Sequence, residues 1–314
     1  MVKTKVNKTQ LNAYDEAERE DPQIHRDQFA HWLRWQYVMK RHRLKLTEMK
    51  VLDVGCGTAA LLRTMYRNKL CPKSYYGVDI RKNVIKEMQT STEDRQLVNL
   101  RKRLGDELKF DAVNLVNDDL SDLEAYEPDA VTFFEVIEHV NKPAGIEMLD
   151  KLKPLVKGDC LFYLSTPCYN GDETVEEEIG PEGNTSDETK KQLTGSHAGN
   201  HIYEWKYEEL KEELEKRFEI VDVFGTFCSK GDVYPNLTEA ETEVYDKLKE
   251  YYDTNVLSVV FAPLYPELSR NCLWVCKAKD DGQDEVEDTE ETSEPEEKAE
   301  EKPKKKKIVR RAAF

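Results

Sequence analysis

The chain has 314 residues, of which 39% are hydrophobic and 35% are charged, and its formal net charge is −16 at pH 7. This length is enough for one large domain or two small ones. No apolar run is long enough for a membrane-spanning helix or a secretion signal, which argues against membrane and secreted proteins and favours a soluble, cytoplasmic one.

Helical and strand patterns alternate along the chain. The first helix is predicted over residues 20–44, with Asp21 as its cap and Pro22 in its first turn. Strands are predicted at residues 50–57, 74–80, 110–120, 129–136, 159–167, 219–228 and 271–278, and further helices at 58–69, 81–104, 142–156 and 204–218. Alternation at this spacing indicates an α/β fold, in which helices cover both faces of a mostly parallel sheet.

The charge is concentrated at the carboxyl-terminal end. Residues 280–301 contain 13 acidic residues and one lysine, and residues 302–314 contain seven Lys or Arg and no acid. Because it has so little apolar surface, the tail of residues 279–314 is predicted to be disordered. Its basic run suggests a nucleic-acid tether, an end that folds back on the acidic run, or a nuclear-import signal.

The seven cysteines are odd in number, and no two of them form a CxxC motif. Several lie in apolar stretches, so we expect reduced, buried thiols, as in a cytosolic protein. They are Cys56, Cys71, Cys160, Cys168, Cys228, Cys272 and Cys276.

The stretch VLDVGCGTAALL, residues 51–62, carries a glycine turn between the first strand and its helix. There Gly55 and Gly57 let a ligand approach the backbone and the start of the helix. Asp53 precedes them, and Asp79 ends the next strand 22 residues after Gly57, where an acid can accept hydrogen bonds from ribose hydroxyls. The loop lacks the Lys-Ser/Thr ending of a phosphate-binding loop and the third glycine of a dinucleotide fingerprint. It therefore predicts a nucleoside cofactor without a pyrophosphate.

Four further motifs accompany this loop: YGVDI, NDDL after the third strand, EVIEHV after the fourth and LSTP after the fifth. Together they resemble the motifs of a class I S-adenosylmethionine-dependent methyltransferase over roughly residues 48–278. The resemblance implies a Rossmann-like, seven-stranded, mostly parallel sheet with an antiparallel last strand, and transfer of a methyl group to an oxygen or nitrogen acceptor. One departure is LKPLVKGD, which replaces the usual proline-glycine-glycine turn before the fifth strand and implies a longer loop.

The resemblance also implies where S-adenosylmethionine would bind. Carried over position by position, it places Gly55 and Gly57 around the methionine part, Asp53 near the amino group, Asp79 at the ribose, Asp118 or Asp119 at the adenine amino group and Glu135 at the methionine end. Cys56 and Ile80 are expected to bind the cofactor as well. The alternative is a generic dinucleotide-type fold in which these acids only cap helices.

The motif EVIEH admits two interpretations. In many methyltransferases of this class it opens the helix after the fourth strand, and Glu138 and His139 then support the substrate side. It also resembles small-RNA 3′-terminal 2′-O-methyltransferases, which implies that Glu135, Glu138, His139 and the later His201 of HIYEW bind Mg²⁺ or Mn²⁺. Without a metal, His139 and His201 are the candidate general bases.

The methyl acceptor stays open between a small molecule and a nucleic acid. Residues 172–188 contain eight carboxylates, which would repel an RNA backbone. Cys168 is interpreted as a loop thiol, because an RNA 5-methylcytosine methyltransferase would need a second Pro-Cys segment after the fourth strand. A further alternative is a protein that binds the cofactor without turnover.

The remaining segments surround the predicted site. Residues 1–47 are predicted to form a helical cap before the methyltransferase domain, residues 48–278. Residues 172–199 are predicted to be a lid over the acceptor pocket or a solvated insertion. Residues 232–270 are predicted to be a helical insertion beside that pocket or a dimer surface.

Overall fold

The computed structural model describes residues 26–168, 201–228 and 234–279. The stretch predicted as a lid, residues 172–199, lies outside these ranges, as do Asp21 and Pro22 and residues 280–314 of the predicted tail. All described elements belong to one unit of the chain, which ends at Lys279.

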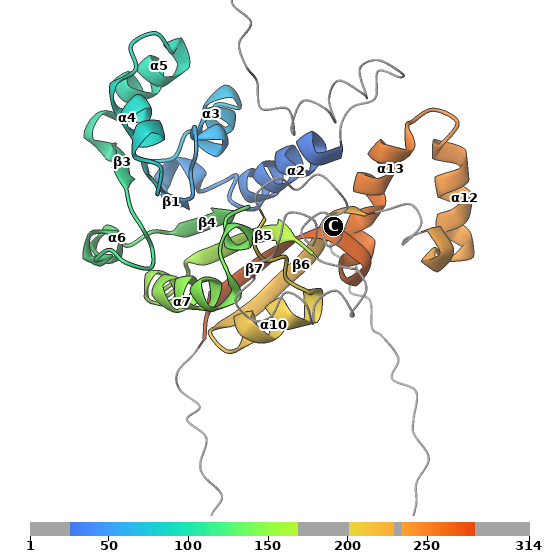
Figure 1. Ribbon diagram of the computed structural model, residues 1–314. Helices are drawn as coiled ribbons and strands as arrows, with labels where there is room; N and C mark the ends of the chain where they lie inside the picture. Colours follow the sequence, from blue (N-terminus) through green and yellow to red (C-terminus); the bar gives the residue numbers. More distant parts are fainter. Residues whose placement is uncertain (1–25, 169–200, 229–233, 280–314) are drawn as a thin grey trace, which may run out of the picture. The chain divides into compact units, whose positions relative to one another are not determined.

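A single sheet forms the centre of this unit (Figure 1). Its strands are β1 (Lys50–Val54), β2 (Ser74–Asp79), β3 (Leu108–Ala112), β4 (Ala130–Phe134), β5 (Leu161–Pro167), β6 (Phe218–Cys228) and β7 (Ser269–Ala278). They are arranged in the order β3-β2-β1-β4-β5-β7-β6. Strand β7 pairs antiparallel with both β5 and β6, whereas the pairs among β1 to β5 are parallel. The predicted seven-stranded sheet with an antiparallel last strand is thereby confirmed.

Helices lie on both faces of the sheet (Figure 1). The α-helices are α2 (Arg26–Arg41), α3 (Ala60–Arg67), α4 (Lys82–Thr90), α5 (Arg95–Leu104), α6 (Ser121–Tyr126), α7 (Lys142–Leu152), α10 (Tyr207–Glu215), α12 (Glu239–Leu248) and α13 (Thr254–Phe261). Short 3-10 helices are η1 (Leu46–Glu48), η2 (Gly105–Glu107), η3 (Ile137–His139), η4 (Lys153–Leu155), η5 (Tyr234–Asn236), η6 (Ala262–Leu264) and η7 (Pro266–Leu268). No helix among the described residues is long and apolar enough to cross a membrane.

Two apolar cores, one on each face, hold the layers together. Successive residues of a strand point to opposite faces, so Val51 of β1 belongs to one core and Leu52 to the other. The core around Val51 includes apolar residues of α2, α3, α4 and α5, and the core around Leu52 includes residues of α6, α7 and α10. All six residues of β2 are buried, as expected of a parallel strand covered on both faces.

Two predicted elements differ from the observed ones. The helix predicted at residues 81–104 is two helices, because Asp94 caps α5 by accepting a hydrogen bond from Leu97 N at 2.9 Å. The strand predicted at residues 110–120 ends at Ala112. Beyond it, Asn114 N donates to Asp118 Oδ2 at 2.8 Å and Asn114 Oδ1 accepts from Val116 N at 3.1 Å. Local side-chain hydrogen bonds of this kind favour a turn over a strand.

Helices α12 and α13 occupy the described part of residues 232–270. They have a small core of their own, which contains Tyr245, Leu257 and Phe261. Helix α13 also contacts α2, which is distant in sequence.

Candidate functional site

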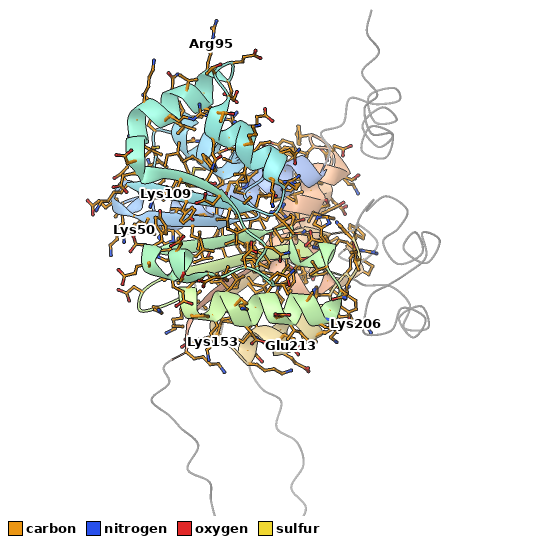
Figure 2. All side chains as sticks on the ribbon, turned by 60° about the vertical axis from the view of Figure 1, so that its left-hand side comes forward. Lys50, Arg95, Lys109, Lys153, Lys206 and Glu213 are labelled. Atoms are coloured by element: carbon orange, nitrogen blue, oxygen red, sulfur yellow. The ribbon has the colours of Figure 1, made fainter. Side chains whose placement is uncertain are left out.

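The parallel strands β1, β2, β4 and β5 all end at the same edge of the sheet, where ligands bind in open α/β folds. Figure 2 shows Lys50, which begins β1, at one end of the sheet and Lys206, which precedes α10, at the other. Among the predicted site residues, Gly55, Asp79 and Glu135 lie at or just after the carboxyl ends of β1, β2 and β4.

The glycine turn after β1 has a backbone that requires glycine. Gly55 has a φ of +75° and Gly57 a φ of +52°, and a Cβ on Gly55 would lie 2.2 Å from Val136 Cγ2. Two backbone hydrogen bonds connect the turn to β2. Gly55 N and Cys56 N donate to Val78 O at 2.8 and 3.0 Å. The glycine turn therefore lies between β2 and the segment that follows β4.

Asp79 lies at the end of β2 and is 5% exposed. Its Oδ2 accepts from Gly57 N at 3.0 Å, and Arg81 donates to both carboxylate oxygens. Burial alone would raise the pKa of Asp79, but the hydrogen bonds from Arg81 and Gly57 outweigh it and the pKa is lowered. The adjacent Ile80 is 61% exposed, so an apolar side chain stands beside an ionised carboxylate at the loop.

Asp53 lies inside the sheet. Tyr75 Oη and Thr132 Oγ1 donate to its carboxylate, the latter at 2.7 Å, and thus link β1 to β2 and β4. Burial raises the pKa of Asp53 to about 6, and the hydrogen bonds from Tyr75 and Thr132 oppose this shift. Burial also raises the pKa of the Cys56 thiol, which makes it a poor nucleophile.

Asp118 and Asp119 lie in the exposed loop after β3. Asp118 accepts a hydrogen bond from Asn114 N, and Asp119 accepts from both Ser121 N and Ser121 Oγ at 3.0 Å. The hydrogen bonds from Ser121 lower the pKa of Asp119. Both acids therefore shape the loop and the start of α6, and their exposed side chains remain accessible to a ligand.

Glu135 joins three segments that are far apart in the sequence. Arg34 Nη1 of α2 donates to Glu135 Oε1 at 3.0 Å, Ser165 Oγ of β5 donates to the same oxygen at 2.8 Å, and Asn271 Nδ2 of β7 donates to both oxygens. Burial would raise the pKa of Glu135, but the charge of Arg34 and these hydrogen bonds lower it. Glu135 has a φ of +54°, so its backbone is held in the left-handed region.

Sequence reasoning missed Arg34, Ser165 and Asn271. For Arg34 a signal was available, because it lies four residues from Ala30 and from Val38, which are 1% and 0% exposed. A charged residue on the buried stripe of a helix needs a partner. No comparable local pattern singles out Ser165 or Asn271.

Glu138, His139 and His201 come together at the end of β4. One ligand atom of each lies within 4.8 Å of the others, and the two imidazole rings have centroids 5.2 Å apart. Two backbone hydrogen bonds bring the segments together, because Ile202 N and Tyr203 N donate to Glu138 O at 2.7 and 3.2 Å. The structure thus assembles three of the four residues predicted to bind a metal, and Glu135 is not part of the group.

The two oxygens of Glu138 have different surroundings. Oε2 accepts from Thr166 Oγ1 at 2.9 Å, whereas the buried Oε1 has no hydrogen-bond partner among the described residues. Burial, together with the charge of Glu135, raises the pKa of Glu138. His201 Nδ1 is hydrogen bonded to Glu204 Oε1 at 2.5 Å, which leaves Nε2 as the ring nitrogen that can face a ligand.

The motif EVIEH does not open an α-helix. Ile137–His139 form the 3-10 helix η3, and Asn141 then caps α7 by accepting from Ala144 N at 3.0 Å. Trp205 is fully buried and pairs with Cys168 in an isolated bridge, which fixes the segment that carries His201 beside β5. All seven cysteines lie in the described part of the chain, and each is a buried thiol.

Comparisons with known proteins agree with this architecture. A methyltransferase domain family matches residues 29–223. The mitochondrial ubiquinone biosynthesis O-methyltransferase of Candida albicans is 33% identical over 120 residues, which are 38% of this chain and 33% of that protein. This chain therefore spans about a third of that relative's length.

Two solved structures are among those similar to this chain. The methyltransferase domain of bacterial CtHen1 is 18% identical, with a TM-score of 0.46 over 79% of this chain and 99% of that one. Coclaurine N-methyltransferase bound to N-methylheliamine and SAH is 13% identical, with a TM-score of 0.47 over 77% of this chain and 72% of that one. Because the family match covers more than half of the chain, this chain belongs to the methyltransferase domain family, and its seven-stranded sheet with an antiparallel β7 is that of a class I S-adenosylmethionine-dependent methyltransferase.

Proposed function

We propose that this enzyme methylates a hydroxyl oxygen that is held by a divalent metal ion at Glu138, His139 and His201. The observation that carries the proposal is the buried Glu138 Oε1, which has no hydrogen-bond partner among the described residues. A buried carboxylate oxygen without a partner is costly unless a ligand satisfies it. Two imidazoles lie within 4.8 Å of this residue, so the missing ligand is a cation that both residue types can bind.

The donor set, one carboxylate and two imidazoles, fits Mn²⁺ better than Mg²⁺. Carboxylate oxygens suit both ions, whereas imidazoles suit transition metals such as Fe²⁺, Ni²⁺ and Zn²⁺. Glu204 would act as the orienting carboxylate of His201, since ligating histidines usually donate their second nitrogen to such a group. The raised pKa of Glu138 belongs to the metal-free protein, because a cation favours the ionised carboxylate.

When bound, the ion would lower the pKa of the acceptor hydroxyl and orient it for attack. The chain's own groups complete the site. Without the ion, His139, which is exposed at the edge of the cluster, would instead accept the hydroxyl proton. Methyl transfer is an in-line displacement that depends strongly on positioning, and Glu135, held by Arg34 and Asn271, would fix the methionine end of the cofactor.

The cofactor itself would lie along the carboxyl ends of β1, β2 and β4. Gly55 and Gly57 would let its methionine part approach the backbone, and Asp79 would accept hydrogen bonds from the ribose. Exposed Ile80 would pack on the adenine, and Asp119 or Asp118 would accept from its amino group. We also propose that residues 48–278 form the catalytic domain. Helix α2 would cover the end of this domain at which the cofactor binds.

The proposed acceptor is the 3′-terminal ribose of an RNA. Its two adjacent hydroxyls suit a metal that binds through a carboxylate and imidazoles, and the run EVIEH followed by HIYEW supports this class. The O-methyltransferase of ubiquinone biosynthesis supports oxygen as the acceptor atom. A small aromatic diol is the competing acceptor, since it offers the same pair of oxygens.

Calorimetric titration with Mn²⁺, with and without S-adenosylhomocysteine, tests the metal. The wild type should give a Mn²⁺ heat that Glu138→Gln and His201→Ala abolish, while Glu147→Gln, an exposed acid of α7, leaves it unchanged. Transfer of labelled methyl should then need Mn²⁺ and an RNA ending in a 2′,3′-diol, and a 2′-deoxy end should be inert. A Mn²⁺ heat that survives in both cluster variants would contradict the metal site, and activity only with a small diol would contradict RNA.

A further inference from the structure

The carboxylate of Asp79 has no acceptor capacity left. Its Oδ1 accepts from Arg81 N and Arg81 Nε, both at 2.9 Å, and its Oδ2 accepts from Gly57 N at 3.0 Å and Arg81 Nη2 at 2.9 Å. A carboxylate offers about four lone-pair sites, so these four donors fill it. Two ribose hydroxyls can bind Asp79 only if two of the present donors leave.

The four donors differ in their freedom to leave. Gly57 N and Arg81 N belong to the backbone of the turn and of the residues that lead into α4, and their positions follow from the fold. The Arg81 side chain is 58% exposed and is joined to the rest of the described protein through Asp79. The guanidinium is therefore the part that moves.

The guanidinium also lies over the glycine turn. A Cβ placed on Gly57 would be 3.3 Å from Arg81 Nη2, so the group covers the carboxylate and the adjacent turn at once. Its two parallel N–H groups match the two carboxylate oxygens, which is the same pattern of two donors that a ribose 2′,3′-diol presents. The guanidinium thus occupies the position of the diol.

We propose that Arg81 is a specificity residue for the cofactor, because its guanidinium occupies the ribose position on Asp79 and a ligand must displace it with both hydroxyls. This inference rests on the proposed role of Asp79 in binding the ribose. A ligand that lacks either hydroxyl leaves one acceptor of Asp79 without a donor after displacement, and such a loss is costly at a buried carboxylate. Arg81 therefore excludes nucleosides without an intact diol from the site.

The test is calorimetric titration of S-adenosylhomocysteine into Arg81→Met, Lys82→Met and Asp79→Ala. Lys82→Met removes the same charge from the next, exposed position and serves as the matched control. Removal of an ion pair whose arginine is 58% exposed should tighten binding to Arg81→Met roughly two- to five-fold, and Lys82→Met should bind as the wild type does. Asp79→Ala should abolish binding. Melting temperatures show that each variant is folded.

Salt provides a second measurement. Added NaCl weakens the Arg81–Asp79 pair, so wild-type affinity should rise with salt while that of Arg81→Met should not. Weaker or unchanged binding in Arg81→Met, with binding lost in Asp79→Ala, would overturn the role of Arg81 and leave the cofactor site intact. Retained binding in Asp79→Ala would overturn the proposed cofactor site itself.

Discussion

Arg34 and Glu135 are 101 residues apart in the sequence, and Arg34 Nη1 donates to Glu135 Oε1 at 3.0 Å. The arginine is 1% exposed and also donates to Asn271 Oδ1 at 2.8 Å. The ion pair therefore connects α2 to the end of β4 and, through Asn271, to β7. Helix α2 is therefore held at the carboxyl-terminal edge of the parallel strands by charge as well as by apolar packing.

Replacing Arg34 with Met should destabilise the protein by about 3 kcal/mol, because Glu135 would stay in place without its charged partner. Urea unfolding measures this change. Arg34→Lys should recover part of the lost stability, because lysine keeps the positive charge but lacks the planar set of N–H donors of the guanidinium. Arg41→Met, at the exposed end of the same helix, is the control and should change stability little. Equal losses in the two Met variants would contradict a specific role for the pair.

Asp53 should make stability depend on pH in a defined window. Its pKa rises from 3.8 to about 6 on folding, so the folded protein holds this proton more tightly than the unfolded chain. The resulting stability, on the order of 3 kcal/mol, is fully present below pH 3.8 and is lost as the pH rises through about 6.

Comparison of the wild type with Asp53→Asn isolates this effect from the other carboxylates. The difference in unfolding free energy between the two proteins, measured in urea from pH 4 to pH 7, should shift in favour of the variant as the pH rises. A difference that is constant across this range would show that Asp53 titrates normally.

Gly55→Ala should be far more damaging than Gly158→Ala. Both glycines have positive φ, at +75° and +56°, so both substitutions carry backbone strain of about 1 kcal/mol. Only at Gly55 would the new Cβ collide with Val136, because no described residue lies within 4 Å of the Cβ position on Gly158. Thermal melting should show the larger loss for Gly55→Ala, and Val136→Ala in the same chain should restore part of it. Equal melting temperatures for the two single variants would exclude the collision.

Ile80→Ala should weaken S-adenosylhomocysteine binding without lowering stability. The side chain is 61% exposed, so its truncation removes little contact in the free protein. Packing on the adenine would bury it, and losing that contact should lower affinity about fivefold. Calorimetry measures the change, with Val221→Ala, a 41% exposed residue of β6, as the control. A loss of stability equal to the loss of affinity would assign Ile80 to the fold.

Local patterns were enough to predict the sheet and the glycine turn. Each signal is contained in a short stretch of sequence: the alternation of strands and helices, the glycines after β1 and the acid at the end of β2. The structure confirms the fold that these signals indicate. The split between α4 and α5 was missed because the helical spacing of apolar residues continues across it. The second helix begins where it does because Asp94 caps its first turn.

The charged network around Glu135 could not be predicted in the same way. Arg34, Ser165 and Asn271 meet through tertiary contacts alone. Of the three, Arg34 alone carries a local signal, its place on the buried stripe of a helix, and that signal does not identify its partner. The cluster of Glu138, His139 and His201 was predicted from a motif, whereas the unpartnered Oε1 of Glu138 becomes visible only from its burial.

The antiparallel direction of β7 has a consequence for shortened chains. Asn271 pairs with Pro167 at the carboxyl end of β5, whereas Lys277 pairs with Leu161 at the opposite end. Strand β7 enters the sheet at the edge where the parallel strands end and leaves it at the opposite edge. Stepwise truncation back from residue 279 would fray the sheet first at the edge remote from the proposed site, and Asn271 would be among the last residues of β7 to be lost.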